Sequence, residues 1–592
     1  MHASTQPQSG DFSIDRRRLA ITSCYCVLIG VGAAFVAKLL LLLIGAITHL
    51  AYDGTLQAGL TQPNPHHWGW PSIFIPVAGG LIVGLIARFG TDKIRGHGIP
   101  EAIHSILEGN SVIPARVAAY KPIASAITIG TGGPFGAEGP IIMTGGAIGS
   151  LFAQFFHLTS FERRTLLVAG AAGGMSATFG SPIAAVLIAV ELLLFEWRPR
   201  SFIPVAVASF VAYVVRVPLL GAASPFLVAH PHAIGAGGYG WALALGIAGG
   251  LVSMLMTRLV YIAEDAYHRL PIHWMWWPAI GGAIVGIGGW FAPSALGVGY
   301  PTIRALLEGH VLASAIAVLI VVKIVIWIAS LSSGTSGGVL APLLMIGAAL
   351  GALASQVIPG HDAGAWAAVG MAATLGGTMR APFMATIFTI ETTHAWGLLP
   401  AAFIGCVAAT ALTVAFVPRS ILTERLARRG MHVAREYSVH PLELIAVAEV
   451  MTPSSQVGAL HAGDTVAAAE AELARSPAPP RDYPVVDERG RAVGIVSRER
   501  LDRCRQDGAA AAPLHSIVAT AQTVLPTERA RHAANLMAQT RSRALLVVDD
   551  RGAWLGWVTA DSLLDAWRRG LAAETRRRRV RSWKRPAVRR AT

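Results

Sequence analysis

Apolar residues dominate the chain from about residue 19 to residue 417, in runs of very unequal length. The run at 19–50 is long enough to cross a bilayer, which takes roughly 20 residues. Several later runs are too short to span, or are broken by Gly and Pro; the later runs lie near 73–88, 117–130, 139–155, 182–195, 202–220, 239–262, 274–291, 312–331, 338–357 and 382–417. Such interruptions predict helices that end inside the membrane, where irregular backbone is tolerated only if protein buries it or it lines a pathway.

The pattern changes after Pro418, because residues 445–570 alternate short Val/Ile/Leu stretches with Ala-rich amphipathic ones, an α/β pattern. Charged residues make up about 8% of 1–420 but about 27% of 421–592, against roughly 25% in ordinary globular proteins. We therefore expect an all-α polytopic membrane domain followed by an α/β domain. The four cysteines show no disulfide or zinc spacing, and we expect free thiols and no metal site.

Arginine clusters predict the topology. Arginines at 16–18 precede the first apolar run, and more follow the last run at 419–429. By the positive-inside rule both termini are then cytoplasmic. We expect a multi-pass protein of a bacterial inner membrane. The basic tail, 571–592, is expected to be disordered and either solvated or in contact with anionic lipid. The net charge of +14 gathers at these exits and in the tail, which suits lipid better than nucleic acid.

Two internal repeats organise the chain. In the membrane part, repeat halves of about 19–220 and 237–420 share four blocks in one order: 96–109 with 297–309, Lys121 with Lys323, 139–154 with 341–356, and 181–191 with 381–391. In the second part, 484–497 matches 546–559. Two membrane halves of like fold indicate a transporter or channel whose binding site lies near the midplane.

Three glycine turns in the membrane part carry the candidate chemistry. GHGIP (96–100), GTGGPFGAEGP (130–140) and GTSGGVLAP (334–342) each place glycines just before an expected helix start. Helix starts offer unpaired N–H groups and the positive end of a dipole, which attract anions. Three such starts aimed at one point would hold a dehydrated anion without a full positive charge. Glu138 stands at one of them, so we expect its carboxylate to block the anion's place when ionised and to vacate it when protonated.

These motifs resemble those of the CLC family of chloride channels and proton–chloride antiporters, whose signatures GSGIPE, G(K/R)EGP and GxFxP stand here as GHGIPE, GAEGP and GVLAP. Residues 445–505 and 513–570 resemble a pair of cystathionine-β-synthase (CBS) domains. The resemblance implies a homodimer with one anion pathway per subunit, an inverted repeat of about 18 broken, tilted helical segments within 19–430, and a cytoplasmic segment at 1–18. It also implies the residues of the site: Glu138 as the gate, with Gly139, and the backbone N–H groups of Gly98, Ile99, Val339 and Leu340 around the anion.

Four positions depart from the family's pattern, and one of them, Leu340 in place of the usual Phe, is tolerated because it acts through its backbone N–H. His97 replaces the usual anion-coordinating serine; a neutral imidazole can donate one hydrogen bond to the anion, and a turned-away packing role is the alternative. Leu422 aligns with the tyrosine of the inner gate, so that hydroxyl is expected to be missing. Leu192 occupies the inner glutamate position of the antiporters, and leucine cannot carry a proton. Glu196 could substitute if it shared a helix face with Leu192.

Two further observations concern a pair of glutamates in the membrane part and the ligand of the CBS pair. Glu191 and Glu391 recur in both halves, which favours a structural role. In the CBS pair, the aspartate expected three residues after Ser497 or Thr559 is absent, so a dimer-stabilising module is favoured over an adenine-nucleotide site.

We therefore expect a chloride-selective anion channel that uses no cofactor. A proton–chloride antiporter is the first alternative, and a CBS-regulated magnesium channel is the second. Since no phosphate loop, nucleophile elbow or dinucleotide fingerprint occurs, we expect no enzymatic activity.

Overall fold

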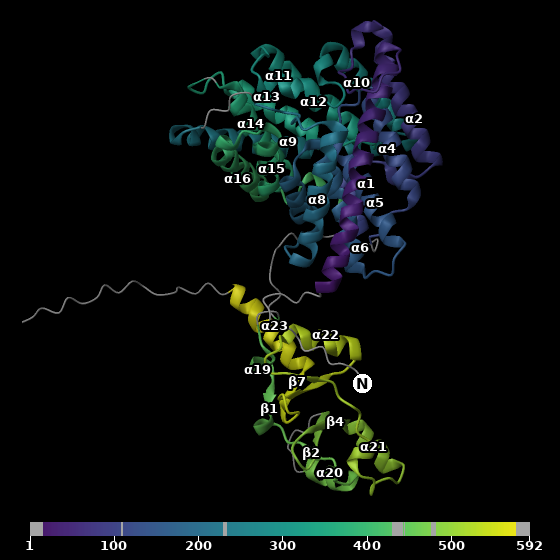
Figure 1. Ribbon diagram of the computed structural model, residues 1–592, viewed down its shortest axis with the longest axis vertical. Coiled ribbons are helices and arrows are strands. Elements are labelled where there is room, and N and C mark those ends of the chain that lie inside the picture. The colour runs from purple at the N-terminus through teal and green to yellow at the C-terminus, as the bar shows by residue number, and fades with distance from the viewer. Residues whose placement is uncertain are drawn as a thin grey trace, which may run out of the picture. The chain divides into compact units, whose positions relative to one another are not determined.

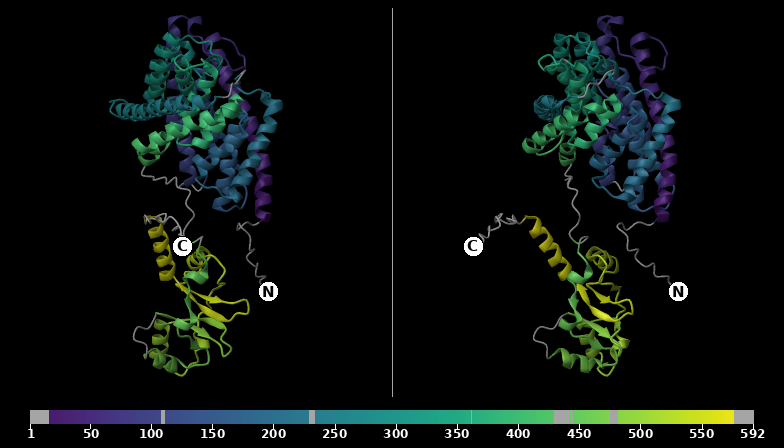
Figure 2. Two further views of the ribbon diagram at one scale, coloured as in Figure 1. Left: turned by 90° about the vertical axis from the view of Figure 1, so that its left-hand side faces the viewer. Right: turned by 60° about the vertical axis from the view of Figure 1, so that its left-hand side comes forward.

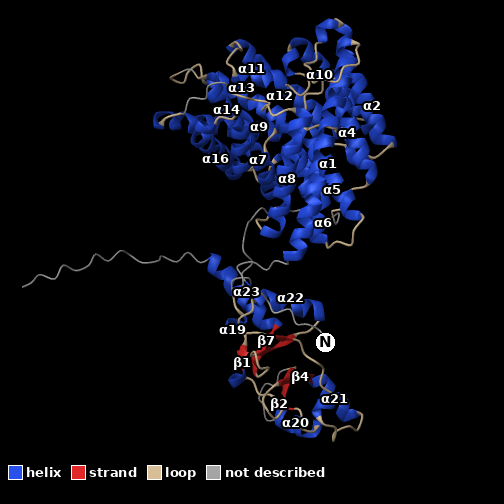
Figure 3. Cartoon of the chain, viewed as in Figure 1, coloured by secondary structure: helices blue, strands red, loops and turns tan. Residues whose placement is uncertain are grey.

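A computed structural model describes residues 16–107, 111–228, 234–360, 362–428, 442, 445–474 and 481–575. The predicted 1–18 segment therefore lies mostly outside the described residues, as do residues 576–592 of the tail. The chain divides into two compact units, 1–437 and 438–592. Helices make up the first unit, and the strands fall in the second (Figure 1, Figure 3). The expected fold, an all-α membrane unit followed by an α/β unit, is confirmed.

The first unit repeats one helix order twice. The first half contains α1 (Arg16–Thr48), α2 (Ile75–Phe89), α3 (Ile99–Leu107), α4 (Ala115–Gly130), α5 (Glu138–Gln154), α6 (Ser160–Phe179), α7 (Pro182–Ile188) and α8 (Pro199–Leu220). The second half contains α9 (Tyr239–His268), α10 (Trp277–Phe291), α11 (Tyr300–Leu307), α12 (Ala313–Ser332), α13 (Leu340–Ala354), α14 (Ala363–Met379), α15 (Pro382–Thr393) and α16 (Leu399–Phe416), and α17 (Ile421–Arg428) follows. Each helix from α9 to α16 is thus the counterpart of the helix eight places earlier.

The helices differ in length as the apolar runs predict. Within the described ranges, six helical segments are long and apolar enough to cross a membrane, the first being Arg16–Asp53. Others, such as Pro182–Leu194 and Leu340–Ala354, are apolar but shorter. The long α1 lies along the outside of the unit (Figure 2, purple), and the shorter α3, α5 and α13 begin at or next to the three glycine turns. The broken helices inferred from the sequence are therefore present.

Reciprocal caps show that the two halves run in opposite directions. The Glu191 carboxylate, just beyond α7, accepts hydrogen bonds from the N–H groups of Phe383 (3.4 Å) and Met384 (2.8 Å) at the start of α15. Conversely, Glu391 near the end of α15 accepts them from Ile183 (3.1 Å) and Ala184 (2.8 Å) at the start of α7. Because the end of each helix meets the start of the other, α7 and α15 are antiparallel. The inverted repeat and the structural role of both glutamates are confirmed.

Small residues let the helices of each half pack closely. A Cβ on Gly145 of α5 or Gly170 of α6 would collide with the backbone carbonyl of the other, and Gly347 of α13 and Gly370 of α14 face each other in the same way. Close backbone approach at paired small residues is typical of helix packing in membranes. This packing holds α5 and α13, the helices that begin at the candidate site, rigidly in place.

The second unit consists of two matched modules. The first has α19 (Val447–Val450), β1 (Thr452–Pro453), β2 (Leu460–His461), α20 (Val466–Leu473), β3 (Asp482–Val486), β4 (Ala492–Ser497) and α21 (Arg498–Gln506). The second has β5 (Thr523–Val524), α22 (Ala530–Thr540), β6 (Ala544–Val548), β7 (Trp554–Thr559) and α23 (Ala560–Thr575). The sheets have the orders β2-β3-β4 and β1-β7-β6-β5. In the first module, β2 pairs with β3 in parallel and β3 pairs with β4 antiparallel. In the second module, β5 pairs with β6 in parallel and β6 pairs with β7 antiparallel, so the predicted repeat is present. Since α23 continues to Thr575, the helix extends past the expected start of the tail at 571.

Candidate functional site

Backbone hydrogen bonds join the three glycine turns. The N–H of Gly96, in the first turn, donates to the carbonyl of Thr335 in the third turn (3.3 Å). Gly136 and Gly338, from the second and third turns, exchange two hydrogen bonds of 3.3 and 2.9 Å in an antiparallel bridge. Turns more than 200 residues apart in the sequence therefore meet at one place, and their predicted convergence is confirmed.

Glycine is required where these turns touch. A Cβ on Gly98 would lie 2.6 Å from the carbonyl oxygen of Gly139. One on Gly139 would lie 2.9 Å from the Cα of Gly338 and would collide with the carbonyl of His97. Backbone thus packs directly on backbone, which brings the helix starts of α3, α5 and α13 closer together than side chains would permit.

Glu138 is fully buried at the meeting point of the second and third turns. A Cβ built on Gly136 would lie 2.5 Å from its Oε1, and one built on Gly338 would lie 2.9 Å from its Oε2. The polar groups that act on the carboxylate from other helices are the Ala341 N–H of α13 and the Tyr300 hydroxyl of α11, together with Lys323 of α12. Among the described residues, none completes hydrogen-bond geometry with either oxygen. The carboxylate therefore stands at the helix start where an anion was expected.

The first turn differs from expectation in one contact. The N–H of Gly98, expected to face the anion, instead donates to the Oε2 of Glu101 at 2.9 Å. Glu101 also lies 3.9 Å from the guanidinium of Arg425. Gly98 is in the left-handed region with φ 88°, so its requirement for glycine is explained by conformation and packing. His97 is buried beside it, at 3% exposure.

Two buried lysines support the turns, one in each half. Lys121 Nζ donates to the carbonyls of Ile94 (2.7 Å) and Gly96 (2.6 Å), and Lys323 Nζ donates to that of Ala295 (2.8 Å). The repeat had matched these lysines without giving them a role. Two cationic side chains thus lie near the candidate anion site, whereas the sequence predicted a site without any full positive charge. Both ammonium groups, however, bind backbone carbonyls.

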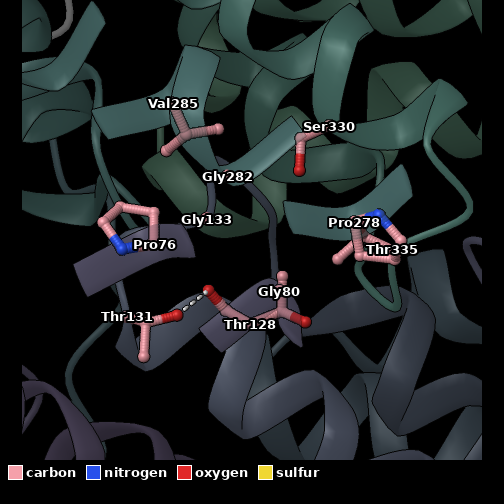
Figure 4. Close-up of a pocket in the computed structure, with 10 residues that line it drawn as sticks. All are labelled: Pro76, Gly80, Thr128, Thr131, Gly133, Pro278, Gly282, Val285, Ser330 and Thr335. Atoms are coloured by element: carbon pink, nitrogen blue, oxygen red, sulfur yellow. Dashed lines mark hydrogen bonds between the residues drawn. The ribbon is translucent and has the colours of Figure 1, made fainter. Parts of the chain in front are cut away.

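A small cavity lies between the two halves behind the turns. Its volume is about 10 Å³, room for about one water molecule. Figure 4 shows Thr128 and Thr131 on one side, joined by a hydrogen bond of 3.2 Å, with Ser330 and Thr335 opposite. Nearby, the Ser125 and Ser336 hydroxyls are 2.8 Å apart. The hydrogen bond between Ser125 and Ser336 therefore connects α4 of the first half to the third glycine turn.

The inner proton position is apolar in the structure as well as in the sequence. Leu192 is buried at 1% exposure, within a π-helical stretch, Ala189–Leu194. The expectation that Glu196 shares its helix face is wrong, because the helix ends at Leu194 and Phe195 adopts a left-handed conformation. Glu196 instead lies 3.6 Å from Arg164 and 3.7 Å from Arg198, and accepts a hydrogen bond from Ser201 (3.1 Å).

The expected inner-gate position also lacks a hydroxyl of its own. Leu422 is fully buried in α17. The hydroxyl of Tyr261, from α9, donates to the carbonyl of its neighbour Ile421. This contact could not be predicted, because Tyr261 lies 160 residues before Ile421 and outside the repeated blocks.

In the second unit, the Ser497 and Thr559 hydroxyls, which nucleotide-binding CBS domains would use for the ligand, accept hydrogen bonds from backbone N–H groups. Ser497 accepts a hydrogen bond from the N–H of Arg500 (3.3 Å) at the start of α21. Thr559 accepts one from the N–H of Ser562 (3.2 Å), and the Ser562 hydroxyl accepts one from the N–H of Thr559 (3.1 Å). Helix capping therefore accounts for both residues.

Comparison with known proteins decides the family. A family model described as voltage gated chloride channel matches residues 79–414, more than half of the chain. The chain belongs to the CLC family. The CBS domain model matches residues 447–506 and 517–569 of this CLC protein.

Relatives of this CLC protein carry two kinds of name. It is 31% identical over 354 residues to the voltage-gated ClC-type chloride channel ClcB of Salmonella typhimurium, covering 58% of this chain and 84% of the relative. It is 32% identical over 365 residues to the H(+)/Cl(-) exchange transporter ClcA of Klebsiella pneumoniae, covering 58% and 77%. A relative named as a channel and a relative named as an exchanger are therefore about equally similar to this chain.

Solved structures share the fold. A slow cyanobacterial Cl-/H+ antiporter matches with a TM-score of 0.62 and 21% identity, over 70% of this chain and 99% of that one. A eukaryotic CLC transporter matches with a TM-score of 0.56 and 20% identity, over 92% and 98%. The second match extends over both units of the CLC protein.

Proposed function

We propose that this CLC protein is a chloride-selective anion channel gated by Glu138. The observation that carries the proposal is the position of the Glu138 carboxylate over the backbone of Gly136 and Gly338, next to the start of α13. An anionic side chain there competes with a permeating anion for the same dipoles. Protonation removes its charge and lets it leave, so anion flux rises as the pH falls.

The other site residues are assigned on the same basis. The N–H groups of Val339 and Leu340, with that of Ala341, which the sequence did not single out, are proposed to bind the anion at the start of α13. Gly139 and Ile99 present the starts of α5 and α3, and the His97 imidazole replaces the family's serine hydroxyl. Gly98 shapes its turn without donating to the anion.

A channel is favoured over an antiporter by the inner end of the pathway. Leu192 is apolar and buried where antiporters of the family carry a glutamate, and the Glu196 carboxylate is occupied by two arginines and a serine. The antiporter remains the alternative, since relatives of equal similarity are named exchangers. The family match favours anion transport over the magnesium channel considered from the sequence.

The wider setting follows the family. We propose a homodimer in a bacterial inner membrane, with both termini in the cytoplasm and no enzymatic activity. The CBS pair is proposed to stabilise the dimer rather than to bind adenine nucleotide, because Ser497 and Thr559 serve as helix caps without the expected aspartates.

Reconstitution into liposomes tests the proposal. Reversal potentials under crossed pH and chloride gradients should follow the chloride gradient alone, and Glu138→Gln should give chloride flux that no longer responds to pH. A steady uphill proton flux driven by chloride would establish the antiporter instead. Flux of Glu138→Gln that stays as pH-dependent as the wild type would show that Glu138 is not the gate.

A further inference from the structure

Two positions differ between the matching glycine turns of the two halves, and one of them places a tyrosine near the candidate site. The first half reads GHGIP (96–100), whereas the second reads GVGYP (297–301), so Tyr300 stands where Ile99 stands in the first half. Gly299 is in the left-handed region with φ 76°, and Tyr300 is the first residue of α11. The inverted repeat therefore brings a phenol hydroxyl, rather than an aliphatic side chain, to the second-half helix start.

Aromatic neighbours fix the direction of the Tyr300 ring. It lies edge-on to Phe226, with centroids 5.3 Å apart at 83°, and to Phe179, at 6.0 Å and 68°. Phe179 in turn packs against Phe388 at 5.1 Å. The residue is half-buried as a whole, but its hydroxyl oxygen is buried. A ring held on two sides leaves the hydroxyl little freedom to choose another partner.

The hydroxyl lies close enough to the Glu138 carboxylate to interact with it. Across the described ranges, no group makes a complete hydrogen bond with this hydroxyl or with either oxygen of Glu138. The other groups that act on the carboxylate are the backbone N–H of Glu138 itself, the N–H of Ala341, and the ammonium of Lys323, whose Nζ binds the Ala295 carbonyl. Tyr300 and Glu138 are thus a buried donor and a buried acceptor that interact without completing a hydrogen bond.

We infer that Tyr300 is a positioning residue, whose hydroxyl holds the ionised Glu138 carboxylate in the anion's place. This inference rests on the proposed gating role of Glu138 and adds a second residue to the gate. The phenol donates to the charged carboxylate, a hydrogen bond stronger than a neutral one. When the carboxylate is protonated, the bond weakens and the gate is free to leave. Losing such a bond should change the ratio of open to closed protein about tenfold.

A double-mutant cycle tests this role. Chloride efflux from liposomes is measured against pH for wild type, Tyr300→Phe, Glu138→Gln and the double variant. Tyr300→Phe should move the midpoint of pH activation upward by about one pH unit, because an ionised carboxylate without its donor is protonated more easily. In the Glu138→Gln background the same change should leave the flux unaltered. Tyr52→Phe is the matched control, since it removes another buried phenol hydroxyl that binds the same glycine turn, at the Thr131 carbonyl (3.1 Å), but is not among the groups that act on Glu138.

The outcomes separate the two hypotheses. If Glu138→Gln alone remains pH-dependent, the proposed gate is wrong. If Glu138→Gln is pH-independent but Tyr300→Phe keeps the wild-type midpoint, shifts it no more than Tyr52→Phe does, or alters flux equally in the Glu138→Gln background, the positioning role alone is overturned. Should Tyr300→Phe fail to give monodisperse protein, Tyr300→Ile, which copies Ile99, takes its place in the same cycle with the same criteria.

Discussion

Adding a single methyl group at Gly136 should open the gate without removing the glutamate. Gly136 is not among the residues with positive φ, so alanine is compatible with its backbone. The three atoms nearest to a Cβ there all belong to the Glu138 carboxylate, with Oε1 at 2.5 Å and the others no farther. Since non-bonded heavy atoms rest about 3.5 Å apart, Oε1 alone must move by about 1 Å (3.5 − 2.5), and Oε2, which lies nearest to the new Cβ, must move farther.

The side chain can make that move at low cost. Carboxylate atoms at the end of a glutamate relocate by rotation, and an off-rotamer torsion costs of order 0.5–1.5 kcal/mol, whereas the overlap itself cannot be tolerated. A closed position destabilised by about 1.4 kcal/mol relative to the open one changes their ratio tenfold. Gly136→Ala should therefore raise chloride efflux from liposomes about tenfold in the pH range where wild-type flux is lowest, and flatten the pH profile.

Controls separate displacement of the gate from general disturbance. Gly32→Ala adds a methyl whose nearest neighbour, an Ile148 side-chain carbon, is 3.7 Å away, and should leave flux unchanged. In a Glu138→Ala background, Gly136→Ala should add nothing. The reasoning is refuted if folded Gly136→Ala protein keeps wild-type flux and pH dependence, or if it raises flux equally when Glu138 has been removed.

Three further perturbations test other parts of the account. His97→Ser should change anion preference or the pH profile of flux; identical bromide-to-chloride ratios and pH profiles would leave His97 a packing residue. Glu391→Ala removes both hydrogen bonds at the start of α7, at 3.1 and 2.8 Å, and should lower the free energy of unfolding in detergent by about 3 kcal/mol. Glu391→Gln should lower it by about half as much, and a loss below about 1 kcal/mol for the alanine variant would contradict the capping role. In the CBS unit, hydrogen bonds from the N–H groups of Arg491 and Arg489 hold the pKa of Asp487 below its usual value. Asp487→Ala should therefore lower the Tm of the full-length protein above about pH 4, and this difference should vanish as the pH falls through the folded-state pKa of Asp487. A Tm difference that does not change with pH would contradict this stabilising role of the Asp487 carboxylate.

The repeated blocks predicted most of the membrane fold, because the residues within each motif determine where a helix begins. Proline and glycine spacing fixed where α5, α7, α13 and α15 begin. The recurrence of Glu191 and Glu391 indicated a structural role, but the sequence could not say that each glutamate caps the helix of the opposite half. That contact depends on the antiparallel arrangement of two helices 200 residues apart.

Contacts that break the repeat were the ones missed. Tyr300 aligns with Ile99 and is one more aromatic residue in an apolar run, so only the folded arrangement places its hydroxyl at Glu138. Gly98 was expected to donate to the anion, and the backbone N–H is indeed at a helix start, but Glu101 three residues later supplies an internal acceptor. The Glu196 argument assumed an unbroken helix, and the left-handed Phe195 ends it.

The central claim is that peptide dipoles at the converged glycine turns bind the permeating anion. Anomalous diffraction from bromide-soaked crystals of the Glu138→Gln variant tests it most directly. The account predicts a bromide peak within hydrogen-bond distance of the N–H groups of Val339, Leu340 or Ala341, at the start of α13. Bromide found only at exposed arginines or lysines, with no peak at these turns, would contradict it.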